Sequence, residues 1–218
     1  MKEIFKIAID GPSGAGKSTI AKAVAKRLGI DYIDTGAMYR AIGLKMTRLN
    51  LPMEESEALQ QMLEETDIDF NAGDVILDDV VVNDLIRTPE MSMAASACSA
   101  LGMVRAKLVE LQRKMGQKKS VIMDGRDICE VVLPDAEYKY YLTATAEERA
   151  RRRTAELIEK GQQVNFEQVL ADIQQRDYND MNREITPLKK ADDAVEIDST
   201  DMSIEEVVNF ICAPVEKE

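Results

Sequence analysis

Histidine is absent from this chain of 218 residues, and cysteine occurs only three times. Without histidine, no mechanism that needs an imidazole base is available. Cys98, Cys129 and Cys212 lie far apart in the sequence and form no C-x-x-C pair, which argues against a structural zinc site. The cysteine usage favours reduced thiols and therefore a cytoplasmic location.

Long apolar runs are also missing. No segment approaches the ~20 residues that a helix needs to cross a bilayer. The chain enters a strand directly, so we expect no signal peptide and no membrane partner. Its 28 Lys and Arg against 40 Asp and Glu give a net charge of −12. A protein this acidic does not attract duplex DNA or an anionic membrane by general electrostatics, so we expect no nucleic-acid partner.

The remaining composition, with 45% hydrophobic and 31% charged residues, is that of a globular protein with a core. The pattern predicts strands at 5–9, 31–33, 121–123, 138–142 and 194–197. It predicts helices at 17–28, 37–49, 54–65, 145–160, 165–182 and from Ser203 onward, and a mostly helical segment at 92–117. A small β-meander at 67–82 interrupts this alternation, and a polar helix start follows at Asn83. The sequence therefore predicts an α/β fold with a five-stranded parallel sheet, helices on both faces and a β-containing insertion.

Two sequence patterns predict capping boxes at helix starts. Thr145 is followed three residues later by Glu148, and Ser203 is followed in the same way by Glu206. In such a box the hydroxyl and the carboxylate each accept a backbone N–H of the first turn.

A phosphate-binding loop is the most informative motif. Gly11, Gly16, Lys17 and Ser18 fit G-x-x-x-x-G-K-[ST] at every fixed position, between a predicted strand and a predicted helix. Loop N–H groups and the helix start favour an anion at this point. We expect a nucleoside triphosphate to be bound by the loop residues Gly11, Pro12, Ser13, Gly14, Ala15, Gly16, Lys17, Ser18 and Thr19.

Two further polar turns follow predicted strands. Asp34-Thr35-Gly36 follows the second strand, and Asp124-Gly125-Arg126-Asp127 follows the strand at 121–123. Ligands of parallel sheets bind at the carboxyl ends of the strands, so we expect both turns to meet the phosphate loop along one edge. Asp124 stands where phosphate-loop enzymes place a carboxylate near Mg²⁺, and the Ser18 hydroxyl is the second predicted metal ligand. The alternative for Asp124 is that it is an ordinary turn aspartate before glycine.

Asp34-Thr35-Gly36 is also the local signature of aspartic proteases. That interpretation requires two such turns in an all-β setting, whereas this turn lies between a strand and a helix of an α/β chain.

Arginines that could bind phosphates gather downstream of the loop. Arg40 and Arg126 lie nearest to the polar turns, and Arg176, Asp180 and Arg183 share one helix face. A second helix face carries Arg149, Arg152 and Arg153. The alternative is that these arginines form solvent-exposed pairs with acidic neighbours, which contribute little.

Together, the motifs at 10–19, 34–40 and 124–127, with Arg176, Asp180 and Arg183, resemble those of bacterial cytidylate kinases, which are phosphate-loop nucleoside monophosphate kinases. The resemblance runs from the first strand to the last helix. It implies one kinase domain, with a core at 1–36, 91–145 and 188–218, a monophosphate-binding insertion at about 37–90 and a short helical lid at about 146–187. One departure is Ile128-Cys129-Glu130, where the family usually has a small turn after Gly-Arg-Asp.

The resemblance also implies roles for individual residues. Arg40, Arg126 and Arg183 would bind the acceptor phosphate, Arg176 and Asp180 the sugar, and Ser96, Arg105 and Asp127 the base, with Asp34 and Thr35 near the nucleotide. Arg149, Arg152 and Arg153 would belong to the lid over the donor phosphates. Lys17, Asp124, Arg126, Arg153 and Arg183 would be the catalytic residues.

The implied activity is transfer of the γ-phosphoryl group of ATP to CMP or dCMP with Mg²⁺, by a monomeric protein. A carboxylate that accepts the cytosine amine opposes the uracil carbonyl, so CMP should be preferred to UMP. The alternatives are another phosphate-loop kinase, such as one for UMP, or a non-catalytic nucleotide switch. Against a guanine-dependent switch, the sequence has no N-K-x-D stretch.

Overall fold

The structure is a computed structural model that describes residues 4–71 and 73–217. The chain divides into two compact units. Met1–Tyr32 and Lys119–Glu218 form the first unit, and Ile33–Lys118 form the second. The second unit takes in helices from residues 91–118, which the sequence analysis grouped with the core. The division into core, insertion and lid as working parts stays a prediction.

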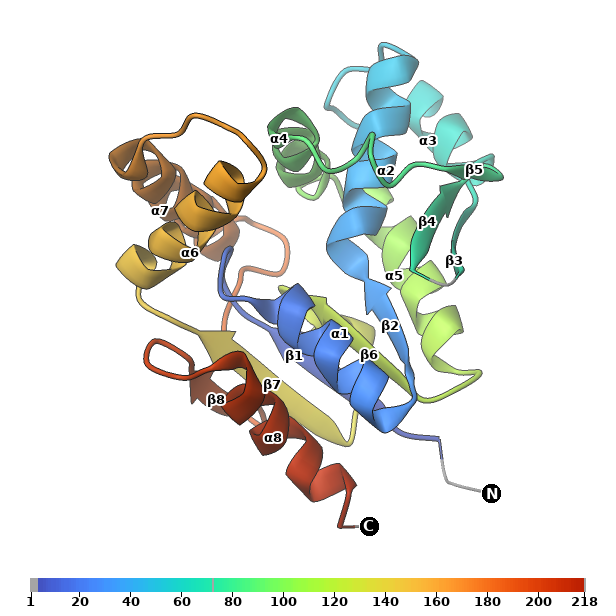
Figure 1. Ribbon diagram of the computed structural model, residues 1–218. Coiled ribbons are helices and arrows are strands. Elements are labelled where there is room, and N and C mark those ends of the chain that lie inside the picture. The colour runs from blue at the N-terminus through green and yellow to red at the C-terminus, as the bar shows by residue number, and fades with distance from the viewer. Residues whose placement is uncertain (1–3, 72, 218) are drawn as a thin grey trace. The chain divides into compact units, whose positions relative to one another are not determined.

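A five-stranded sheet has the strand order β2-β6-β1-β7-β8 (Figure 1), and all of it except the last two residues of β2 belongs to the first unit. The strands are β1 (Lys6–Asp10), β2 (Asp31–Asp34), β6 (Val121–Gly125), β7 (Tyr138–Thr143) and β8 (Val195–Asp198). β1 pairs in parallel with both β6 and β7, and β7 pairs in parallel with β8. The chain leaves β1 toward one side of the sheet and later fills the other side, so β1 ends at the point where the strand order reverses. Ligands of such sheets bind at that point.

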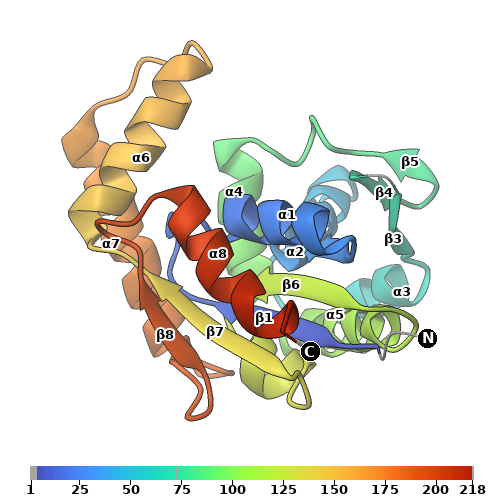
Figure 2. The same cartoon turned by 60° about the horizontal axis from the view of Figure 1, so that its bottom comes forward.

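Two helices, α1 (Lys17–Leu28) and α8 (Ile204–Val215), pack against each other over the sheet (Figure 2). Their apolar faces share one core with β1 and β7, in which Ile9, Val24, Leu142 and Ile211 are fully buried. α8 begins with the predicted capping box, because Ser203 accepts from the Glu206 N–H and the Glu206 carboxylate accepts from the Ser203 N–H. The parallel sheet flanked by helices confirms the predicted fold class.

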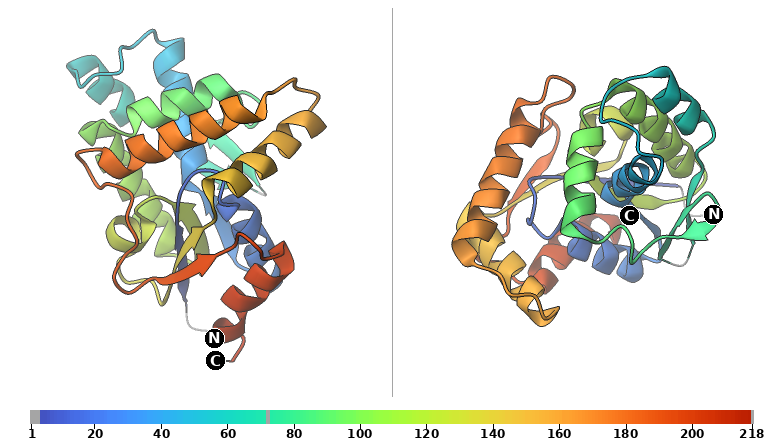
Figure 3. Two further views of the ribbon diagram at one scale, coloured as in Figure 1. Left: turned by 90° about the vertical axis from the view of Figure 1, so that its left-hand side faces the viewer. Right: turned by 90° about the horizontal axis from the view of Figure 1, so that it is seen from above.

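A pair of helices, α6 (Ala146–Glu159) and α7 (Phe166–Asn182), also belongs to the first unit (Figure 3). Their shared core is small and contains Ala150, Leu157, Val169 and Ile173. A single π-helical turn, η1 (Ile128–Val132), follows β6.

The second unit contains four helices and a three-stranded antiparallel sheet of order β3-β4-β5 among its described residues. Its strands are β3 (Ile68–Asn71), β4 (Asp74–Leu77) and β5 (Val80–Val81). Its helices are α2 (Thr35–Arg48), α3 (Glu57–Glu64), α4 (Pro89–Cys98) and α5 (Gly102–Gly116). α2 packs mainly on α4, with a smaller contact to α5.

Two local predictions were wrong. Asn83 does not start a helix, because its side chain fastens the hairpin by accepting from the Val75 N–H at 2.7 Å and donating to Asp74 at 2.8 Å. By contrast, the mostly helical character predicted for 92–117 is confirmed. The segment contains two helices, and the first ends where the Ser99 hydroxyl donates back to the Ser96 carbonyl at 2.8 Å.

The second wrong prediction concerns the start of α6. Thr145 accepts from the Glu148 N–H at 3.3 Å as predicted, but the Thr145 N–H donates to Thr200 instead of to Glu148. The Glu148 carboxylate pairs with Arg151 and Arg152, so only half of the capping box forms.

Candidate functional site

The glycine loop between β1 and α1 takes a conformation that only glycine adopts easily. Gly11 has φ +149°, and a Cβ there would lie 2.0 Å from the carbonyl oxygen of Leu142 on β7. Gly16 has φ +86° and caps the first turn of α1. Any side chain at Gly11 would therefore displace the strand that supports the loop.

Lys17 is folded back into this loop. It is 6% exposed, and its ammonium donates to the carbonyl oxygens of Gly11 and Pro12, each at 2.7 Å. Burial, followed by the charge of Arg126, lowers the pKa of Lys17 well below its usual value, although Asp124 and Asp10 oppose the change. A buried cation whose two hydrogen bonds go to neutral carbonyls is suited to bind an anion, which would raise its pKa again.

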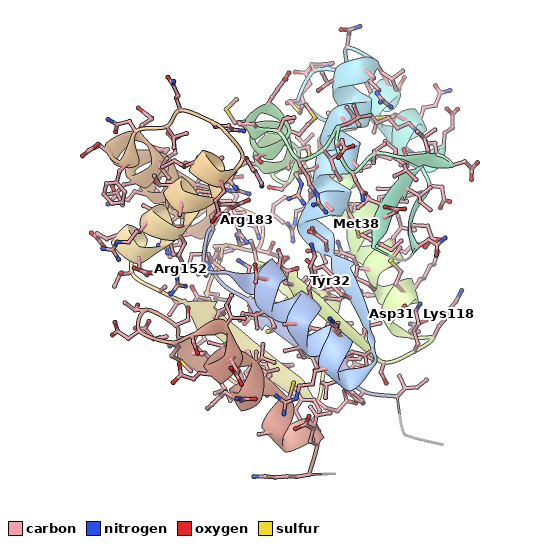
Figure 4. All side chains as sticks on the ribbon, viewed as in Figure 1. Asp31, Tyr32, Met38, Lys118, Arg152 and Arg183 are labelled. Atoms are coloured by element: carbon pink, nitrogen blue, oxygen red, sulfur yellow. The ribbon has the colours of Figure 1, made fainter. Side chains whose placement is uncertain are left out.

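Ser18 and Asp124 meet beside the loop. The Ser18 hydroxyl donates to Oδ2 of Asp124 at 3.0 Å, and the Tyr32 hydroxyl donates to Oδ1 at 2.8 Å. Asp124 is 5% exposed, and its register partner on β1 is Ile9, two residues before Gly11. The structure thus brings the two predicted metal ligands together and orients the carboxylate through Tyr32, which Figure 4 labels on β2.

The arginines near β6 pair with carboxylates of the first unit. Arg126 donates from Nε to Asp180 on α7 at 2.6 Å, and Arg183 lies 3.9 Å from Asp127. Burial alone would lower the pKa of Arg126 and raise that of Asp180. Their mutual attraction reverses both directions, and Arg176 and Arg183 lower the pKa of Asp180 further. These predicted phosphate and sugar residues therefore lie in one charged cluster, formed by the turn after β6 and the C-terminal end of α7.

Asp10 links the phosphate loop to this cluster. Its carboxylate accepts from the backbone N–H groups of Ile128 and Cys129, both at 2.8 Å, at the start of η1. Burial raises the pKa of Asp10 to about 6, although these two hydrogen bonds oppose the change. The Glu130 side chain pairs with Lys189 at 3.0 Å. The Ile128-Cys129-Glu130 departure thus forms a turn that is fixed from the end of β1.

The arginines of α6 have protein partners. Arg149 is buried and donates to Ser13, Ala144 and Asp177. Arg152, labelled in Figure 4, donates to the Ser199 carbonyl at 2.6 Å, and Arg153 pairs with Glu156 at 2.7 Å.

The second unit places another group of predicted residues on α2 and α5. Asp34 caps α2 by accepting from the Ala37 N–H at 2.8 Å, and it pairs with Arg40 at 3.2 Å. Thr35 is buried at the first position of α2. Arg105, which is 5% exposed, lies with its guanidinium 3.4 Å from the Tyr39 hydroxyl.

Ser96 lies on α4, half-buried, and its carbonyl accepts from the Ser99 hydroxyl at 2.8 Å. Of the phosphate-loop residues, Ala15 is buried and Thr19 is exposed on the first turn of α1.

The sequence analysis gave no role to four polar residues, although Asp10 and Tyr39 lie within its motifs. Tyr32 and Tyr39 orient predicted site residues, Asp10 fixes η1, and Asp177 pairs with Arg149. A carboxylate directly between an apolar strand and the phosphate loop was a usable signal for Asp10. No sequence spacing indicates Asp177, because its partner lies 28 residues away.

Within residues 4–71 and 73–217, no helix has the length and apolar character to cross a membrane. Over the same ranges, no cluster of three or more His, Cys, Asp or Glu side chains could hold a metal ion.

The chain is similar to known kinases along nearly its whole length. A family model described as cytidylate kinase matches residues 7–217. The cytidylate kinase of Caldicellulosiruptor saccharolyticus is 56% identical over 97% of this chain and 95% of its own length. The cytidylate kinase of Clostridioides difficile is 51% identical over 96% of this chain and 97% of its own length.

Solved structures with low sequence identity share the fold. An uncharacterized protein from Eubacterium ventriosum matches with a TM-score of 0.54 at 13% identity, over 99% of this chain and all of that one. Shikimate kinase from Bacteroides thetaiotaomicron matches with a TM-score of 0.50 at 14% identity, over 98% of this chain and 99% of that one. With a family match over residues 7–217 and relatives more than 50% identical, the chain belongs to the cytidylate kinase family.

Proposed function

We propose that this chain transfers the γ-phosphoryl group of ATP to the phosphate of CMP or dCMP, giving ADP and CDP or dCDP. The single observation that carries the proposal is the family match over residues 7–217, because a phosphate loop alone does not identify the acceptor. The geometry of the loop supports the donor half of the reaction.

The residues of the first unit can stabilise a moving phosphoryl group without covalent chemistry. The acceptor phosphate oxygen is already an anion, so no strong base is required. Catalysis then depends on positioning and on neutralising charge. Lys17 supplies a desolvated cation at the loop, and Arg126 and Arg183 supply planar donors that suit phosphate oxygens.

The donor set at Ser18 and Asp124 suits Mg²⁺. This ion prefers oxygen ligands and is commonly held by one or two protein groups together with substrate phosphates and water. A hydroxyl and a carboxylate 3.0 Å apart beside the loop fit that requirement. When bound, Mg²⁺ would neutralise charge on the donor phosphates.

The acceptor residues are proposed from the family resemblance, unit by unit. In the first unit, Arg126 and Arg183 bind the acceptor phosphate, Arg176 and Asp180 the sugar, and Asp127 the base. In the second unit, Arg40 binds the phosphate and Ser96 and Arg105 the base, with Asp34 and Thr35 supporting them. The pairs Arg40–Asp34 and Arg126–Asp180 support these assignments, because each holds a guanidinium ready in one orientation.

The lid is proposed on the same basis. Arg152 and Arg153 of α6 contact the donor phosphates when the lid closes and excludes water. The hydrogen bonds of Arg149 favour an indirect role. A monomeric state, a cytoplasmic location and the absence of a nucleic-acid partner stay predictions.

Coupled ADP release with a panel of acceptors tests the proposed function. With ATP and Mg²⁺, we expect fast turnover with CMP and dCMP, much slower turnover with UMP, and almost none without an acceptor. Release that does not depend on an acceptor would support a nucleotide switch instead. Turnover with UMP equal to that with CMP would contradict the proposed base selectivity.

A further inference from the structure

One buried arginine joins the phosphate loop to the α6–α7 pair. Arg149 is 5% exposed and lies near the start of α6. Its guanidinium donates to the carbonyl of Ala144 at 2.9 Å, to the carbonyl of Ser13 at 2.7 Å and to the Asp177 carboxylate at 2.6 Å. Nε and both terminal nitrogens therefore each donate to a protein acceptor, so three of the five N–H groups of the guanidinium hold the protein together.

The contact to Ser13 fixes part of the anion-binding backbone. The carbonyl of Ser13 and the N–H of Gly14 belong to one planar trans peptide, so they point in opposite directions. When Arg149 holds the carbonyl on its own side, the Gly14 N–H must face away from α6. That N–H is one of the loop groups that we expect to bind the donor phosphates.

Packing around Gly14 supports the same coupling. Gly14 has φ +76°, and a Cβ there would lie 3.3 Å from Cβ of Arg149 and 3.6 Å from Cδ1 of Ile173 on α7. The outer side of the loop therefore rests directly on α6 and α7, so a shift of either helix would reach the Ser13–Gly14 peptide.

Asp177 completes the arrangement. It is 9% exposed, and its Oδ2 accepts from Arg149. Its Oδ1 is buried and has no hydrogen-bond partner among the described residues. A buried guanidinium that loses its counter-charge is strongly unfavourable, so Arg149 depends on Asp177 to remain beside the loop.

We propose that Arg149 and Asp177 are a positioning pair for the phosphate donor, which orients the Ser13–Gly14 peptide from α6 and α7. Neither side chain touches the phosphates. The inference rests on the proposed function only for the identity of the donor, ATP.

Binding of ATP, measured by titration calorimetry with Mg²⁺ and without CMP, tests this pair. Asp177→Asn removes the charge, and its amide group can occupy the place of Oδ1 without losing a hydrogen bond. Arg149→Lys keeps the charge, but a single nitrogen cannot bridge all three acceptors. We expect each variant to bind ATP about 10-fold more weakly or worse, as for the loss of a charge-assisted hydrogen bond. The double variant should be little worse than either single one.

Asp172→Asn is the matched control, because Asp172 lies on α7 but is exposed and accepts only from Gln168 on its own helix within the described contacts. It should bind ATP as the wild type does. In steady-state assays the KM for ATP should rise in the pair variants while the KM for CMP stays within about twofold, a split that a general loss of stability would not produce.

ATP affinity within twofold of the wild type in both pair variants, or an equal rise of both KM values, would overturn the inference. If Arg149→Lys does not fold, as judged by thermal unfolding, Asp177→Asn decides alone. A wild type that binds ATP but does not phosphorylate CMP would contradict the proposed function. The role of Arg149 and Asp177 would then still be decided by the ATP affinities of the variants.

Discussion

Replacing Lys17 by methionine should separate stability from turnover. In the wild type the Lys17 ammonium is 6% exposed and donates to two carbonyls at 2.7 Å. Methionine fills a similar volume but provides neither charge nor donor. The substitution therefore removes a positive charge whose burial is unfavourable for folding but which the proposed reaction needs.

The two consequences differ in size. Loss of two hydrogen bonds from a charged donor would destabilise the fold by about 1.5–3 kcal/mol each. Relief from burying a cation returns several kcal/mol, so the two effects largely cancel. We expect the free energy of unfolding to change by less than about 2 kcal/mol in either direction. Loss of a preorganised donor to the moving phosphoryl group should lower kcat by about 10²–10³, which corresponds to about 2.7–4 kcal/mol.

Urea unfolding and CMP-dependent ADP release measure the two quantities on the same protein. Lys26→Met is the matched control, since Lys26 lies on the same helix α1 but is exposed, and it should keep wild-type turnover. Turnover of Lys17→Met within tenfold of the wild type would refute the reasoning. So would a loss of stability large enough to explain the lost activity.

Three further perturbations have definite expected outcomes. Burial raises the pKa of Asp10 from 3.8 to about 6, so the folded chain holds this proton more tightly than the unfolded chain. As the pH rises from about 4 to above 6, the free energy of unfolding of the wild type should therefore fall by up to about 3 kcal/mol more than that of Asp10→Asn, both measured by urea unfolding. A wild type that gains stability relative to Asp10→Asn over this pH range would contradict the prediction. Ser203→Ala should destabilise the fold by about 1 kcal/mol and lower Tm by about 2–4 °C, because it removes the N-cap of α8. Ser203→Gly should destabilise the fold by only a few tenths of a kcal/mol. Equal losses of stability in the two variants would show that the cap is not the cause. Arg126→Lys should raise the KM for CMP about tenfold with little change in the KM for ATP, because lysine cannot both reach Asp180 and present a planar fork to phosphate; an unchanged KM for CMP would remove Arg126 from the acceptor site.

Local signals in the sequence predicted the sheet and most helix boundaries. α1 has the predicted bounds because Gly16 and Gly29, both left-handed, mark its two ends. The start of α8 was predictable because its capping box involves only Ser203 and Glu206. The local prediction was wrong where a side chain forms its hydrogen bonds outside its own turn, as Asn83 does with Asp74 and Val75.

In the candidate site, too, contacts that follow from a local motif were predictable and contacts between distant residues were not. The phosphate loop and its Ser18 and Asp124 neighbours followed from one motif and from the rule that strand ends carry ligands. The pairing of Arg126 with Asp180 joins residues 54 apart, and helix periodicity alone suggested the nearer Arg176 as the partner of Asp180. Such pairs depend on how α6 and α7 pack on the rest of the first unit, which no local pattern specifies.

Competition between CMP and UMP in one reaction tests directly whether the protein selects cytosine. With ATP, Mg²⁺ and equal concentrations of CMP and UMP, the initial ratio of CDP to UDP equals the ratio of the two kcat/KM values. We predict that CDP forms in large excess, by about 10² or more, because the proposed cytosine site would have unpaired polar groups when uracil enters. A ratio near one, or ADP formation without either diphosphate, would contradict it.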